Sequence, residues 1–175
     1  MNSNYRNALV AVALLGLARP ASADVICDWN AKALDFVVSH KMLPPPAERV
    51  VAMTQLAMFD AVNSIDRKYR PYLVQLAAAP TASKEAAAAT AAATVLAGVD
   101  PQTQDQTKAA LAAYLAAIPD SAAKSKGIKL GEAVAAKILE ARANDGANAP
   151  ILHINEEMGY RVVTPVIELH RNLPA

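Results

Sequence analysis

One helical segment, residues 46–65, most constrains what this chain can fold into. Its small and apolar side chains recur three and four residues apart, which is the spacing of one face of an α-helix. Met53, Leu56 and Phe59 extend the apolar surface around the cylinder. Because a helix that is apolar on most sides is covered by neighbours, the pattern predicts a central helix. The face residues are Ala47, Val50, Val51, Thr54, Ala57, Met58, Ala61, Val62 and Ile65.

Four further segments show helical spacing, and each begins at a capping residue and ends at Pro or Gly. They are a helix from Asp28 to the prolines after Leu43, one over Ser83–Ala97, one from Asp100-Pro101 to Pro119, and one from Asp120 or Ser121 to Asn144-Asp145-Gly146. The chain is 54% hydrophobic but only 5% aromatic, and alanine supplies much of the apolar content. This composition favours helices over sheets. We therefore predict an all-α fold, a bundle of about five helices.

The first 23 residues have the pattern of a signal peptide. Arg6 precedes an apolar run, Ala8–Leu17, and Ala21-Ser22-Ala23 forms a small-x-small cleavage site. The run covers only about 15 Å as a helix, about half a bilayer core, which disfavours a membrane span. Anchoring through Cys27 as a lipoprotein is disfavoured, since Ile26 stands where a small residue is needed. We expect export to the periplasm or medium, with residues 1–23 removed, 24–146 a helical domain and 147–175 an irregular tail.

Charge and cysteine content exclude several classes of partner. Cleavage removes Arg6 and Arg19, so Lys+Arg falls from 17 to 15 against 16 Asp+Glu, a net charge of −1. This charge disfavours nucleic acid or an anionic membrane as a partner, and no membrane anchor remains after cleavage. We expect a second copy of the chain, or partner helices, to cover exposed apolar faces. The single cysteine, Cys27, is expected to be a half-buried thiol with no histidine beside it to activate it.

Few residues suggest a chemical role. His40 ends an apolar helical face and is interpreted as a satisfied or half-exposed histidine rather than a ligand. Asp60 and Asn63 lie in the most apolar helix, and a buried carboxylate must be paired or protonated. We expect Asp60 to accept hydrogen bonds from the connector after this helix, Arg67–Tyr72, the alternative being a catalytic acid or base. Gly127 and Gly131 are interpreted as permitting close helix packing.

The tail offers the ligand types of a metal site but not the spacing. His153, Glu156, Glu157 and His170 could ligate zinc or iron, yet no helical pattern holds them in a metal-binding arrangement. A metal-binding protein built on these residues is the third alternative, and the solvated tail is preferred. No phosphate-binding glycine loop, nucleophile elbow or carboxylate pair occurs. We therefore predict no catalytic, cofactor-binding or metal-ligating residue in this chain.

The order of segments resembles the N-terminal region of the bacterial vanadium-dependent haloperoxidases and their PAP2-type acid-phosphatase-like relatives. The resemblance spans about residues 28–146. It is carried by Trp29-Asn30, Ala57–Asn63, the alanine-rich helix, Pro119-Asp120, Gly127-Ile128, Gly131–Ala135, Ile138-Leu139 and Arg142–Gly146. It implies a helical fold in which vanadate or phosphate binds through Lys, Arg, a Ser-Gly-His segment and a further His of a C-terminal helical half.

This chain departs from the family's pattern where the chemistry would lie. It has no Ser-Gly-His segment, and its Arg70-Pro71 pair comes too early, so no catalytic residue carries over. Residues 151–175 do not resemble the family's linker, which suggests a truncated or frame-disrupted product. The leading hypothesis is thus an exported N-terminal portion of such a protein, inactive alone and without vanadate. The alternative is a stand-alone periplasmic module that binds a partner protein.

Overall fold

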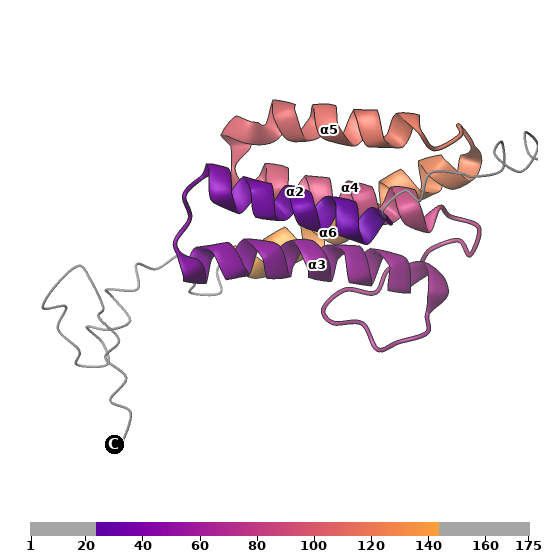
Figure 1. Ribbon diagram of the computed structural model, residues 1–175. Coiled ribbons are helices and arrows are strands. Elements are labelled where there is room, and N and C mark those ends of the chain that lie inside the picture. The colour runs from indigo at the N-terminus through magenta and orange to yellow at the C-terminus, as the bar shows by residue number, and fades with distance from the viewer. Residues whose placement is uncertain (1–23, 144–175) are drawn as a thin grey trace, which may run out of the picture. The chain divides into compact units, whose positions relative to one another are not determined.

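The structure is a computed structural model that describes residues 24–143, and over these residues it contains helices and no strand. The α-helices are α2 (Val25–Ser39), α3 (Pro44–Asp66), α4 (Lys84–Val99), α5 (Gln104–Ala116) and α6 (Ala122–Arg142), and a short 3₁₀ helix, η1 (Pro101–Thr103), precedes α5. The predicted all-α fold of about five helices is confirmed (Figure 1). The proposed signal peptide and tail lie outside the described residues. Residues 24–138 belong to one compact unit, and residues 139–143 are the described part of a second.

The central helix is α4, not α3 as the sequence pattern predicts. Helix α4 contacts α2, α3 and α5, and every residue from 86 to 93 is buried. Alanine side chains make a narrow cylinder, which several neighbours can approach closely at once. Helix α3 contacts α2 and α4, and its Phe59 remains 39% exposed. The alanine-rich segment therefore organises the bundle although its side chains are small.

The helices begin at capping residues, but the predicted cap of α2 is wrong. Asp24, rather than Asp28, caps α2, because its Oδ1 accepts hydrogen bonds from the backbone N–H groups of Ile26 and Cys27 at 2.9 and 3.0 Å. Ser83 caps α4 as expected. Asp100 caps the segment after α4, but Pro101 opens the 3₁₀ turn η1 before α5 begins. These caps set where each helix enters the bundle.

Helices α5 and α6 are less buried than their patterns predict. Of the expected α5 stripe only Thr107 is buried, whereas Leu111, Tyr114, Leu115 and Ile118 are half-buried. In α6 the expected face is correct at Gly131, Val134, Ala135 and Ile138, but Ile128 is half-buried, Ala141 is exposed and Leu130 is buried instead. Within residues 24–143, α5 packs mainly on α4 and η1, so its apolar stripe is only partly covered.

Two glycines allow α6 to lie directly against α4, as predicted. A Cβ atom at Gly127 would lie 2.4 Å from the carbonyl oxygen of Ser83, and one at Gly131 would lie 2.4 Å from that of Ala87. The backbone N–H of Ser83 also donates to the Ala123 carbonyl at 2.9 Å. The four-residue spacing places both glycines on the same α4-facing side.

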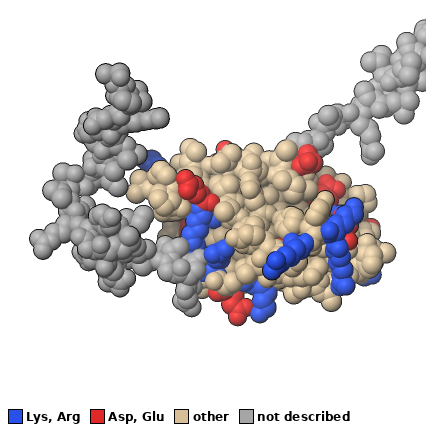
Figure 2. All heavy atoms as spheres, turned by 90° about the horizontal axis from the view of Figure 1, so that it is seen from below, with Lys and Arg blue, Asp and Glu red and all other residues tan. Residues whose placement is uncertain are grey.

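The outer surface carries scattered charge. Figure 2, seen from below, shows Lys and Arg side chains at several places on this face, some of them beside Asp or Glu. Among the helices of residues 24–143, none is long and apolar enough to cross a membrane.

Candidate functional site

Asp60 is the most deeply buried carboxylate of the described chain and organises the connector between α3 and α4. Its side chain is 0% exposed, and it accepts backbone hydrogen bonds from Tyr72, Leu73 and Val74 at 2.8 to 3.0 Å. Three N–H donors replace the water that the carboxylate loses on burial. The predicted structural role of Asp60 is confirmed, although the donors extend two residues beyond Tyr72.

Two neighbours on α3 complete this attachment. The Asn63 amide donates to the Tyr69 carbonyl at 2.8 Å and accepts from the Tyr69 N–H at 3.0 Å. The Ser64 hydroxyl oxygen accepts from the backbone N–H of Leu76 at 3.2 Å. The connector is therefore held along its length by the last two turns of α3. All three polar side chains have hydrogen-bond partners.

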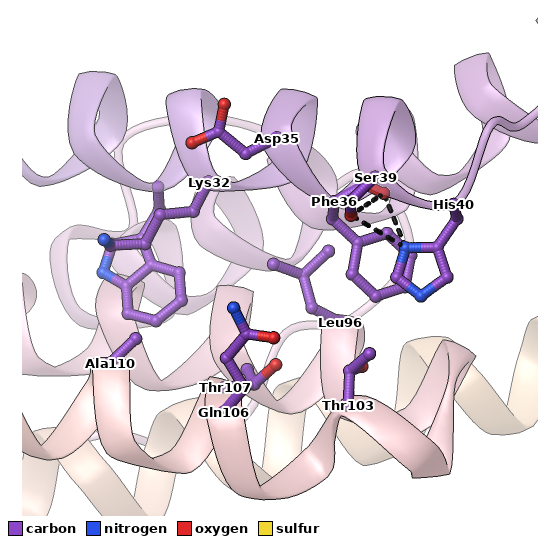
Figure 3. Close-up of a pocket in the computed structure, with 11 residues that line it drawn as sticks. Lys32, Asp35, Phe36, Ser39, His40, Leu96, Thr103, Gln106, Thr107 and Ala110 are labelled. Carbon is purple, nitrogen blue, oxygen red and sulfur yellow. Dashed lines mark hydrogen bonds between the residues drawn. The ribbon is translucent and has the colours of Figure 1, made fainter.

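A cavity of about 250 Å³ lies between α2 and the α4–α5 corner, and polar groups gather at its His40 end. Figure 3 shows His40 beside Phe36 and Ser39, with Leu96 and Thr103 across from them. The His40 and Phe36 rings stack with centroids 4.0 Å apart. The residues that line the cavity are Trp29, Lys32, Asp35, Phe36, Ser39, His40, Leu96, Thr103, Gln106, Thr107 and Ala110.

His40 joins the end of α2 to the end of α4. Its Nδ1 lies 2.6 Å from the Phe36 carbonyl oxygen, and its Nε2 lies 2.9 Å from Oδ2 of Asp100. Both partners accept hydrogen bonds, so both ring nitrogens donate and the imidazolium form is favoured. The Phe36 carbonyl, and then Asp100, raise the pKa of His40 above 6.5. The interpretation of His40 as a satisfied, part-exposed histidine is confirmed.

Ser39, His40 and Asp100 resemble a hydrolytic triad in composition but not in proton arrangement. The Ser39 hydroxyl donates to the Phe36 carbonyl at 2.9 Å and lies 3.2 Å from His40 Nδ1. A general base needs an unprotonated nitrogen facing the nucleophile. Because Nδ1 of His40 already donates to Phe36, it gives Ser39 no general base. The cluster is a joint between helix ends.

This joint predicts a pH-dependent contribution to stability. The raised pKa of His40 means that its contribution is full below about pH 6.5 and is lost as the pH rises through the folded-state pKa. The Gln102 N–H and then His40 hold the pKa of Asp100 below 3.8. Only at still lower pH does protonation of Asp100 remove its ion pair with His40, so the contribution to stability is lost there. We expect His40→Gln to lower the thermal midpoint more at pH 5 than at pH 9, measured by circular dichroism. Equal losses at both pH values would contradict the imidazolium assignment.

A larger hollow, about 620 Å³, lies where the start of α2, the middle of α3 and the start of α4 meet. We call it the α2–α3–α4 groove. Met58, 1% exposed, lies among its lining residues, and Ile26 and Phe59 remain 41% and 39% exposed. Its lining residues are Asp24, Val25, Ile26, Met58, Phe59, Val62, Lys84 and Glu85. The groove is therefore largely apolar, with charged residues from the first turns of two helices.

The charge at the α2 and α4 starts is acidic. The Tyr114 hydroxyl donates to Glu85 at 3.1 Å. Burial raises the pKa of Tyr114, and the hydrogen bond and charge of Glu85 and the charges of Asp28 and Asp24 raise it further. Two of these carboxylates, Asp24 and Glu85, line the groove, and we call these two the acidic rim. Lys84, the one basic lining residue, is ion-paired with Asp66.

The remaining residues with a possible chemical role are the cysteine and the metal-ligand candidates of the tail. Cys27 is exposed, so the expected half-buried thiol is wrong, because the first turn of α2 leaves this position facing solvent. His153, Glu156, Glu157 and His170 lie outside the described residues. Within residues 24–143 no group of three or more His, Cys, Asp and Glu side chains could hold a metal ion. Sequence reasoning missed the His40–Asp100 pair, which joins residues 60 positions apart.

Comparisons with models of protein families, with curated proteins and with solved structures found no match to this chain.

Proposed function

We propose that this chain is a non-catalytic helical domain that binds an apolar helical segment of another polypeptide in the α2–α3–α4 groove. The observation that carries the proposal is the exposure of Ile26 and Phe59 beside the buried Met58 in an apolar hollow of about 620 Å³. Helices commonly bind such grooves by inserting one apolar face. The acidic rim adds a preference for a segment with basic residues at its ends.

The first candidate for the partner is a catalytic half of the vanadium haloperoxidase or PAP2-phosphatase type. One of the stretches that contribute to the family resemblance, Ala57–Asn63, supplies Met58 and Phe59 to the groove and Asp60 to the connector. In this proposal the chain is the exported N-terminal portion, and vanadate or phosphate is held by the other half. Translating the neighbouring DNA in all frames tests this candidate. A continuation with Lys, Arg-Pro and Ser-Gly-His supports it, and the lack of one contradicts it.

The second candidate is a stand-alone periplasmic module whose partner is a separate protein. A stand-alone module is expected to expose only small, scattered apolar patches outside the groove. Light scattering and hydrophobic-dye fluorescence on a chain that begins at Asp24 discriminate the two. A module stays monodisperse with weak dye binding, whereas a portion that lacks its other half aggregates and binds dye strongly.

Peptide binding tests the proposal common to both candidates. The probe is a labelled Leu/Ala helical peptide with arginine at both ends, added to the chain that begins at Asp24. We expect saturable binding by fluorescence anisotropy, weakened at least about tenfold by Phe59→Glu, because a carboxylate would be buried without a partner. Val38→Glu is the matched control, since Val38 is 75% exposed on α2 and does not line the groove. Equal weakening by both variants would refute groove binding.

A further inference from the structure

We infer that, before cleavage, the chain's own segment Arg6–Arg19 occupies the α2–α3–α4 groove and covers it. The inference rests on the proposed function, because it requires that the groove accept an apolar helical segment. It adds a regulatory step: removal of residues 1–23 uncovers the binding surface.

The first argument is the position of the tether. Residue 23 is bonded to Asp24, and Asp24 itself lines the groove. From Leu17, the end of the apolar run, to Asp24 the chain advances seven residues, a reach of up to about 23 Å. A short linker of this kind gives an effective concentration on the order of millimolar. The apolar run therefore competes strongly with any separate polypeptide.

The second argument is complementarity of charge and apolar character. Residues 1–23 contain Arg6 and Arg19 on either side of Ala8–Leu17 and contain no Asp or Glu. The groove presents apolar side chains beside the acidic rim, and its lysine is already paired with Asp66. The segment thus has the chemistry that the groove favours, an apolar helix former with basic ends. Cleavage removes both arginines together with the apolar run.

Site-specific photo-crosslinking in the full chain tests the inference. With p-benzoylphenylalanine in place of Phe59, we expect an intramolecular crosslink to residues 8–17, mapped by mass spectrometry. The same group in place of Val38 is the matched control and is expected to give at least about tenfold less of this product. The double variant Leu14→Asp, Leu15→Asp is expected to reduce the Phe59 crosslink by a similar factor, because two carboxylates would enter an apolar hollow.

Four results would overturn the inference: a crosslink from position 59 to residues 144–175, a crosslink to a second copy, no crosslink, or a crosslink that the leucine variant leaves unchanged. The proposed function is tested separately by the arginine-flanked peptide on the chain from Asp24. Peptide binding without the intramolecular crosslink would refute the inference alone. The loss of peptide binding would refute the proposed function.

Discussion

Replacing Asp60 with alanine is expected to lower the free energy of unfolding by about 3–5 kcal/mol, the largest effect of any single substitution considered. The carboxylate is fully buried and accepts hydrogen bonds from three consecutive backbone N–H groups, at Tyr72, Leu73 and Val74. Alanine would leave these donors without their acceptor and open a small void beside α3. The connector would then separate from α3, or the domain would unfold.

Urea unfolding followed by circular dichroism measures this loss. Asp66→Ala is the matched control, because Asp66 lies on the same helix and pairs with Lys84, whose side chain is 49% exposed. An ion pair that is open to solvent contributes about 0–1 kcal/mol. If Asp60→Ala and Asp66→Ala lose similar amounts, Asp60 does not organise the connector.

Gly131→Ala is expected to destabilise the domain by about 2–3 kcal/mol, although alanine is the better helix former. The added Cβ would lie 2.4 Å from the Ala87 carbonyl oxygen and 2.9 Å from the Ala91 backbone nitrogen. Both are backbone atoms of α4, so the contact is relieved only by moving α6 away from the central helix. Such a movement reduces the packing of Gly127 and Gly131 against α4.

Gly98→Ala provides the comparison for this substitution. Gly98 lies near the end of α4 and is exposed, so alanine there is expected to leave stability unchanged or to raise it by up to about 1 kcal/mol. Thermal unfolding of the two variants beside the original chain measures the difference. A Gly131→Ala protein as stable as the Gly98→Ala protein would show that the helices do not approach as closely as described.

Helix existence and the role of Asp60 could be predicted from the sequence because both depend on local rules. Caps such as Ser83 act within one turn, and a carboxylate in an apolar helix must find donors nearby. The central position of α4 could not be predicted from the spacing of apolar residues. That spacing shows how apolar a helix surface is, but it does not show how many other helices can pack against a helix with small side chains. The partial burial of the α5 stripe could not be predicted either, because apolar spacing does not show how much of a helix its neighbours cover.

The groove and the His40 joint were beyond sequence reasoning because they join distant positions. Met58 and Glu85 come from different helices, and His40 meets Asp100 only after α3 and α4 have folded between them. Each residue alone has the pattern of an ordinary core or surface position. The acidic rim likewise appears only when the starts of α2 and α4 lie at the same groove.

Methyl NMR of methionine tests groove binding most directly, because the two best-placed methionines lie on the same helix. Met58 lines the groove, whereas Met53 is also buried, at 3% exposure, but does not line it. During titration of the chain from Asp24 with the arginine-flanked peptide, we predict a saturable shift of the Met58 methyl signal while that of Met53 stays in place. An unchanged Met58 signal, or equal shifts of both methionines, would contradict the account.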